Sequence, residues 1–517
     1  MAVTSVPARR ATRLAAAASA LLAAACGGGG AGGGSPVDDG PPPVAALLQP
    51  YAEPGSGESF GEAEARHLLR RVAFLAPQAE VDRCVRDGLD RTVDRLLDAP
   101  RDTSAEADAD ALVEDPLRPG FDELERSWLS LMVRTNSPAR EKMALFWHQR
   151  LAVSGRMLHN GNLRWMKEYR DLLRTHGLGN YRTLLEELTH NGAMLVWLSG
   201  LPSDKEHPNE NYAREFWELF TLGVDNGYTQ QDIQEAARAF TGWDSRWVPE
   251  TELEELYFHA EAHDEGTKTI LGQTGSFGEL DVVRITLERP EAASYLARRL
   301  LEGLCYRDPE PELVSELAQR AVDGGWELKP LVRLVAKSRA FYSARARRSQ
   351  VADPTVQMVG LSRATQLPLE SWELLWNAEA MGHVPLDPPS VKGWPQGLGW
   401  SGEQPLLDRA VMADELAGKD HVHDADGNDA APVEVTHLLP PGTGVTGADV
   451  VDHLARLLDV TLSAAERAVL VDYMDHTTGD DGAPVAAPFD PSDPDAVDVK
   501  VRGLLSILAQ HPDAMKN

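Results

Sequence analysis

From about Glu62 onward, apolar residues recur every three or four positions along almost the whole chain. This spacing places apolar side chains on one face of a helix, as in Leu89, Val93 and Leu96. Strand-like alternation is scarce, and residues 267–271 are the best candidate for a strand. The sequence therefore predicts an all-α body with long connecting loops and at most a minor β-hairpin. Further helices are expected at residues 121–135, 139–153, 163–176, 181–191, 208–222, 229–241, 290–304, 310–323, 328–338 and 368–381.

The size and charge of the chain limit its partners. Its 517 residues, 43% of them hydrophobic, can bury one large core or two adjoining ones. The formal net charge of −30 repels phosphate backbones and anionic membranes, whereas cations or a basic protein remain possible partners. No apolar run approaches the roughly 18 to 20 residues of a spanning helix. We therefore expect no nucleic-acid partner, and contact with a membrane only through an anchor.

The N-terminus is typical of a bacterial lipoprotein signal. Three arginines between positions 9 and 13 precede an apolar run that ends at Cys26, the residue that would be acylated. The leucine expected three places before the cysteine lies four places before it, at Leu22, so an ordinary secretory leader is the alternative. Residues 1–25 are thus predicted to be removed, and the Gly/Pro-rich residues 26–45 to form a tether. The body would then lie in the cell envelope, on the periplasmic or outer-surface side.

The rest of the chain is divided into three parts. Residues 46–419 are predicted to form the helical body, residues 420–447 an acidic insertion or linker, and residues 448–517 a helical segment that packs on the body. Within the insertion, residues 424–428 have the alternating oxygen ligands of a calcium loop. The sixth and twelfth positions lack the expected Gly and Glu, so a solvated acidic surface is favoured.

Apart from Cys26, the chain has two cysteines, Cys84 and Cys305. A single possible bridge between residues so far apart is not a disulfide framework. Two separate buried cysteines are the favoured interpretation, although pairing stays possible.

The most informative segment is a predicted helix over residues 208–222. Pro208 suits the first helical position and Gly223 the residue after the last turn. Most of the other positions are aromatic or aliphatic, so we expect the helix and its charged groups to be largely buried. Arg214 can pair with carboxylates four residues away on either side. One polar stripe contains His207, Glu210, Asn211, Arg214 and Glu218, with Glu215 beside it.

A second helix is predicted over residues 229–241, capped by Thr229. If the two helices pack antiparallel, Glu235 and Arg238 would approach Glu215 and Glu218. Three interpretations remain open: a structural network of carboxylates and arginines, a metal site, or acid–base catalysis by a glutamate of raised pKa. No spacing matches a known metal signature.

Two other features are candidates for the same site. His148 lies within an apolar helix, where a core histidine bonded to a neighbour is the simpler interpretation. The loop 388–395 carries Lys392 and Trp394 between prolines, and rigid loops of this kind often line sites. Packing remains the simpler explanation for this loop too.

Several motifs in order resemble the bacterial DUF1800 family, over roughly residues 60–510. The resemblance implies an exported, predominantly helical protein, often encoded beside a DUF1501 protein that is similar to sulfatases and alkaline phosphatases. It implies no reaction and no catalytic residue. The chain departs from the family pattern at Phe74-Leu75, where Phe-Gly is usual, and in the acidic insertion after Lys419. The matching motifs are residues 67–71, 146–148, 207–223, 236–243, 263–272 and 388–395.

Two functional hypotheses follow. The first is an envelope enzyme, hydrolase-like or dependent on a divalent metal ion, with its site on the two adjacent helices. The second is a non-catalytic lipoprotein that binds a partner such as the DUF1501 protein. The residues assigned to the enzyme site are Glu215, Glu218, His148 and Lys392 for catalysis, Arg214, Arg238, Asn211 and Trp394 for substrate binding, and His207, Glu210 and Glu215 for a metal.

Overall fold

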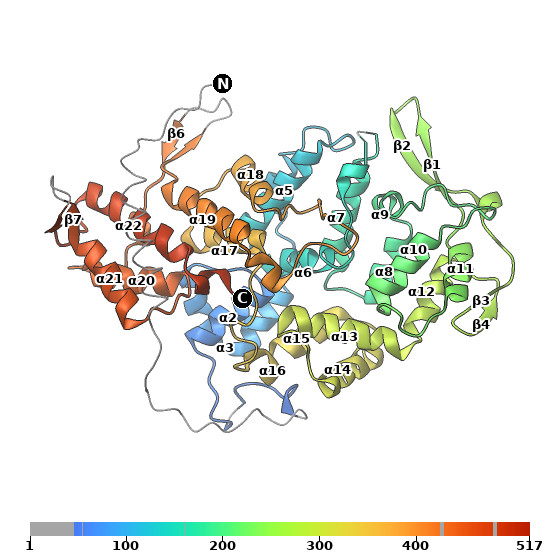
Figure 1. Ribbon diagram of the computed structural model, residues 1–517, viewed down its shortest axis with the longest axis horizontal. Helices are drawn as coiled ribbons and strands as arrows, with labels where there is room; N and C mark the ends of the chain where they lie inside the picture. The colour runs from blue at the N-terminus through green and yellow to red at the C-terminus, as the bar shows by residue number, and fades with distance from the viewer. Residues whose placement is uncertain (1–45, 54, 160, 424–428, 479–482) are drawn as a thin grey trace.

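Helices make up most of the computed structural model, which describes residues 46–53, 55–159, 161–423, 429–478 and 483–517. The chain is 56% helical, and its sheets are small two-stranded antiparallel pairs, which confirms the predicted all-α class (Figure 1). The helices are α2 (Glu62–Val72), α3 (Gln78–Leu97), α4 (Thr103–Asp110), α5 (Phe121–Arg134), α6 (Pro138–His148), α7 (Arg164–His176), α8 (Tyr181–Thr189), α9 (Gly192–Trp197), α10 (Glu210–Glu215), α11 (Gln230–Ala239), α12 (Glu279–Leu287), α13 (Pro290–Leu304), α14 (Pro311–Asp323), α15 (Leu328–Ala336), α16 (Arg339–Tyr342), α17 (Pro354–Thr365), α18 (Ser371–Ala380), α19 (Glu403–Gly418), α20 (Gly447–Leu457), α21 (Ala464–Asp475) and α22 (Pro494–Ala509).

Four hairpins interrupt the helices in the ranges that the structure describes. The strand expected at residues 267–271 forms as β3, which pairs with β4. The hairpin of β1 and β2 follows α11 directly and extends from one end of the molecule (Figure 1). The strands are β1 (Trp243–Val248), β2 (Leu253–Phe258), β3 (Lys268–Ile270), β4 (Gln273–Gly275), β5 (His421–His423), β6 (Asp429–Pro432), β7 (His476–Thr478) and β8 (Pro484–Ala486).

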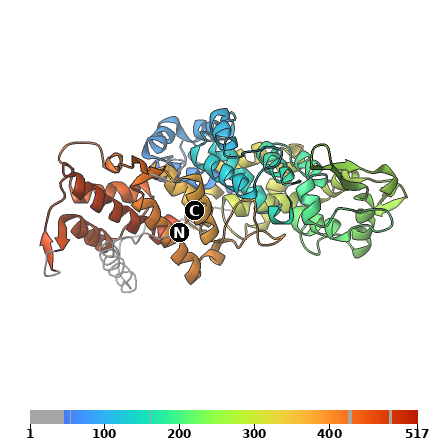
Figure 2. The ribbon, with the colours of Figure 1, turned by 90° about the horizontal axis from the view of Figure 1, so that it is seen from above.

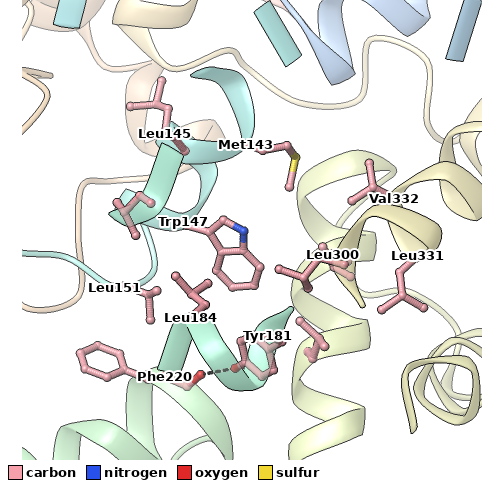
Figure 3. Close-up of a cluster of buried hydrophobic side chains, with 14 of the residues drawn as sticks. Met143, Leu145, Trp147, Leu151, Tyr181, Leu184, Phe220, Leu300, Leu331 and Val332 are labelled. Carbon is pink, nitrogen blue, oxygen red and sulfur yellow. Dashed lines mark hydrogen bonds between the residues drawn. The ribbon is translucent and has the colours of Figure 1, made fainter. Parts of the chain in front are cut away.

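The larger hydrophobic core lies between helices from the first two thirds of the chain. Trp147 of α6 stacks on Tyr181 of α8, with ring centroids 5.5 Å apart. The Tyr181 hydroxyl donates to the carbonyl oxygen of Phe220 at 2.7 Å, so this buried polar group is satisfied (Figure 3). Leu300 of α13 completes the cluster from the other side.

A second hydrophobic cluster joins α17, α18 and α19 to the C-terminal helices. Arg502 of α22 is buried and donates to the carbonyl oxygens of Ala417 and Lys419, so the last helix is bonded to the end of α19. Arg70 of α2 donates to the carbonyl oxygen of Leu458, which ties this part to the larger core. Figure 2 shows the resulting elongated molecule, with α20 to α22 at one end and the β1–β2 hairpin at the other.

Both cysteines of the body are buried and free, which confirms the interpretation of two separate residues. Burial raises the pKa of the Cys305 thiol to about 12, so this group is not a reactive thiolate. Within the described ranges, no helix has the length and apolar character needed to cross a membrane. Cys26, the tether and the calcium-like loop at residues 424–428 lie outside the described residues.

Candidate functional site

The predicted helix at residues 208–222 forms, but in two parts. Helix α10 continues as a π-helical turn, η3 (Phe216–Thr221), in which the Leu222 amide donates to the carbonyl oxygen of Trp217 at 2.8 Å. The Asn209 side chain caps the start of α10. Aromatic side chains on one face of this segment, including Trp217, are buried in the core.

The polar stripe pairs as predicted, but it is not buried. Arg214 lies 3.7 Å from Glu210 and 3.6 Å from Glu218, so one arginine bridges both carboxylates. The side chains of Arg214, Glu210 and Glu218 are 36%, 41% and 22% exposed, and the expectation of a largely buried network is therefore wrong. The physical reason is that the aromatic residues take the core-facing side of the helix and leave the stripe on the solvent side. Ion pairs in this position stabilise a protein by at most about 1 kcal/mol.

Glu215 has the most perturbed carboxyl on this helix. Partial burial and then the charge of Glu218 raise its pKa, while the charges of Lys392 and Arg214 oppose the shift. The charge of Lys392 thus acts on the Glu215 carboxyl group from a distance. No hydrogen bond or ion pair joins the two residues in the described part of the chain.

Helix α11 does not carry its charged residues to Glu215. Arg238 forms ion pairs with Glu235 at 2.8 Å and with Asp264 at 2.7 Å. Both carboxylates belong to a network around β3, where the Thr269 amide donates to Glu235. The expected approach of Glu235 and Arg238 to the carboxylates of α10 is therefore wrong, because this face of α11 packs against the β3–β4 hairpin.

The three predicted metal ligands are not gathered in one place. His207 precedes α10, is 86% exposed, and lies 3.3 Å from Asp204 rather than beside Glu210 or Glu215. Among the described residues, no group of three or more histidine, cysteine or acidic side chains is arranged to hold a metal ion. Asn211 is exposed, and its side-chain amide nitrogen Nδ2 donates to the carbonyl oxygen of Leu198 at 3.1 Å.

His148 is a core histidine, and it does not face α10. Its Nε2 accepts the Leu386 amide hydrogen at 2.8 Å, which leaves Nδ1 to donate to the Tyr169 hydroxyl at 3.0 Å. Burial lowers the pKa of His148 to about 3, so the ring is neutral. Trp394 is also buried and packs edge-on against His148, so it does not form an open pocket wall. Together these residues fix the loop that follows α18.

The beginning of that loop lines an open pocket of about 590 Å³. The pocket lies where the loop meets the ends of α9, α18 and the short helix η2 (Gly155–Met157). Trp197 of α9 contributes its ring, and the indole nitrogen is buried without a partner among the described residues. The lining residues are Ser154, Arg156, Trp197, Glu379, Gly382, Val384, Asp387, Pro388 and Pro389.

Asp387 is the fixed anion of this pocket. One oxygen of its carboxylate accepts the Ser154 hydroxyl at 2.9 Å, and the other accepts Nε of Arg156. The neighbouring carboxylate, Glu379, is exposed at the pocket wall, and no described side chain or backbone group binds it. The pocket therefore contains one carboxylate that is paired with an arginine, Asp387, and one that no described group binds, Glu379.

A third carboxyl group, that of Glu125, does not line the pocket but interacts electrostatically with three residues that do, Asp387, Arg156 and Glu379. This α5 side chain is only 2% exposed, and its Oε1 has no hydrogen-bond partner among the described residues. Burial and then the charge of Asp387 raise the pKa of Glu125 to about 8, with Glu379 adding to the shift and Arg156 opposing it. A buried acid that keeps its proton at neutral pH beside ionised carboxylates is typical of acid–base sites.

The comparisons with known proteins give one match. A family model described as "Protein of unknown function (DUF1800)" matches residues 67–515, which is most of the chain. No curated protein matches the chain. No solved structure matches it either.

Proposed function

This chain belongs to the DUF1800 family, whose function is unknown, and we propose that the pocket near Glu125 is the active site of a hydrolase-type enzyme. The observation that carries the proposal is the buried carboxyl group of Glu125, whose Oε1 has no partner in the described part of the chain and whose pKa is raised to about 8. Burying an acid in this way costs free energy. A purely structural scaffold gains nothing from that cost, whereas acid–base catalysis needs a proton held at neutral pH.

Each carboxyl group of the pocket has a distinct part in the proposed reaction. Glu125, which is buried and does not line the pocket, supplies a proton to the leaving group through a water molecule. Glu379, which no described residue binds, accepts a proton from the attacking water as the bond to the leaving group breaks. Burial is the main cause of the raised pKa of Glu125, and Asp387, held by Ser154 and Arg156, adds to it. Water is consumed: its hydroxyl group joins the substrate and one of its protons goes to Glu379. The starting state is restored when one proton passes from Glu379 to Glu125 through solvent.

Turnover of model substrates tests this proposal. We expect the purified body to hydrolyse at least one class in a panel of chromogenic glycosides, carboxylic esters, phosphate esters and peptide anilides. Glu125→Gln and Glu379→Gln should each lower kcat about 100-fold or more, the usual effect of losing a general acid or base. The rate should also fall as the pH rises through about 8, where Glu125 loses its proton.

Glu210→Gln is the matched control, because Glu210 lies in the exposed stripe of α10, and this variant should keep the wild-type rate. If the wild type turns over none of the four classes, or if Glu125→Gln retains full activity, the enzyme assignment fails. The scaffold for a DUF1501-type partner would then be the better hypothesis.

The proposed location is the cell envelope, with the chain anchored by a lipid on Cys26. The supporting observation is the signal-like sequence that ends at this residue. Metabolic labelling with palmitate should mark the wild-type protein, and Cys26→Ala should abolish both the label and the membrane association. Unchanged labelling and fractionation of Cys26→Ala would refute the anchor.

A further inference from the structure

Helix α18 presents two tryptophans to solvent on the side that leads to the pocket. Trp372 and Trp376 are 46% and 56% exposed, whereas Leu374 and Ala378 on the opposite side are buried in the second core. Residues four apart lie on the same helix face, about 6 Å apart along its axis. Glu379, three residues after Trp376, continues this face and lines the pocket. The two rings and the pocket wall therefore form one continuous surface.

The first ring is held in a fixed orientation. The indole nitrogen of Trp372 donates to Oε2 of Glu370 at 2.6 Å, and the ring makes an edge contact with His423. Glu370 is itself bound by Nζ of Lys419 at 3.0 Å. A large side chain fixed before binding loses little conformational freedom when it meets a ligand. The exposure of Trp372 is thus built into the structure and does not result from a loose side chain.

The chemistry of this surface selects among possible ligands. The pocket holds Glu379 and Asp387, and its arginine is already paired, so phosphorylated or other anionic ligands are repelled. A stable protein partner needs about 800 Å² of contact surface per side with an apolar centre. Two rings on one narrow helix face, with Glu373 and Glu379 beside them, do not supply a surface of that size and character. A sugar ring offers a face of C–H groups and a rim of hydroxyls, which matches an indole face bordered by carboxylates.

We infer that Trp372 and Trp376 form a track that binds a polymeric glycan and directs the chain toward the pocket. The inference rests on the proposed function and names its substrate class: a neutral or weakly charged polysaccharide. Successive sugar rings stack on the two indoles. The glycosidic bond that enters the pocket is protonated on its oxygen by Glu125 through a water molecule, while another water activated by Glu379 adds to the anomeric carbon and the bond to the leaving sugar breaks.

Retention on insoluble chitin, cellulose and peptidoglycan tests the track. The wild type should bind at least one of the three, and the double variant Trp372→Ala/Trp376→Ala should bind it at least tenfold more weakly. Hydrolysis of a small chromogenic glycoside should change less than twofold, because a small substrate does not reach the track. Trp376→Ala alone should give a smaller loss of binding than the double variant. This variant should not disturb the fold, because the Trp376 ring has no hydrogen-bond or aromatic partner among the described residues.

Trp247→Ala is the control, since Trp247 is 56% exposed like Trp376 but lies on the distant β1–β2 hairpin (Figure 1). This variant should bind as the wild type does. Glu125→Gln should still bind the polymer but not cleave it, so loss of catalysis and loss of binding are distinguishable. If the wild type binds none of the polymers, or if the double variant binds equally well, the track does not exist. Loss of a co-purifying protein from the double variant, with glycan binding intact, would show a protein interface instead.

Discussion

Replacing Arg174 with methionine should lower the free energy of unfolding by about 3 to 5 kcal/mol, the usual cost of breaking a buried ion pair. Arg174 of α7 is 7% exposed and lies 2.9 Å from Glu141 and 2.6 Å from Glu106. Glu141 is 1% exposed and also accepts the indole hydrogen of Trp128 at 2.9 Å. Methionine would leave the Glu141 carboxylate in the core without its cation. Urea unfolding followed by circular dichroism measures the loss.

Arg214→Met provides the comparison on the surface. This arginine also bridges two glutamates, but it is about one third exposed, so its loss should cost no more than about 1 kcal/mol. Equal losses for the two variants would mean that burial does not decide the strength of these networks. The ion pairs of Arg174 would then contribute no more to stability than the exposed ion pairs of Arg214.

Glu125→Gln should stabilise the protein, and the gain should grow with pH. The pKa of Glu125 is raised from 4.5 in the unfolded chain to about 8 in the fold, so the folded state binds more protons than the unfolded state between these values. The wild type therefore loses stability as the pH rises from 4.5 to 8, because the unfolded chain gains free energy by ionising this carboxyl group while the folded chain keeps it protonated. Glutamine does not titrate. At pH 7 the variant should be more stable by on the order of 3 kcal/mol, with no such gain below pH 4.5.

Melting temperatures of wild type and Glu125→Gln between pH 4 and pH 9 show this dependence directly. Glu210→Gln, which removes an exposed carboxylate, should follow the wild type across the range. A gap between Glu125→Gln and wild type that stays constant with pH would mean that Glu125 does not titrate in this window. Burial would then not raise the pKa of Glu125.

The helices were predictable because their signals are local. Helix α13 begins at Pro290 and ends at Leu304, as expected from a proline suited to the first turn and an apolar face repeating every three or four residues. The strand β3 was found from its alternation for the same reason. The π-helical turn after Glu215 was not predicted, because its hydrogen bonds depend on how Trp217 packs in the core.

The error over α10 has a clear physical origin. Aromatic residues such as Trp217 and Phe220 predicted burial of the whole helix, but they occupy only one side of it. The regular three- and four-residue spacing of the polar stripe was itself the sign of a solvent-facing side. The pairing of Arg214 was predictable because it is set by spacing alone, whereas its exposure is set by the tertiary fold.

The pocket could not be assembled from the sequence, because its parts come from distant segments. Asp387 meets Arg156 only after α5, α9 and α18 have packed. One local signal was present, however. Glu125 shares the apolar face of α5 with Trp128, Leu129 and Met132, all of them buried. A carboxylate at such a position predicts a buried acid, and buried acids without a partner are candidates for function.

Glu125 is expected to hold a proton at neutral pH beside the proposed acid–base pocket. Infrared spectra of wild type minus Glu125→Gln, recorded from pH 4 to pH 9, isolate the carbonyl stretch of this one protonated carboxyl group. We expect the band to persist at pH 7 and to disappear with a midpoint near 8. A band that disappears with a midpoint near 4.5, as for an exposed glutamate, would show that Glu125 is ionised at neutral pH and is not the proton donor.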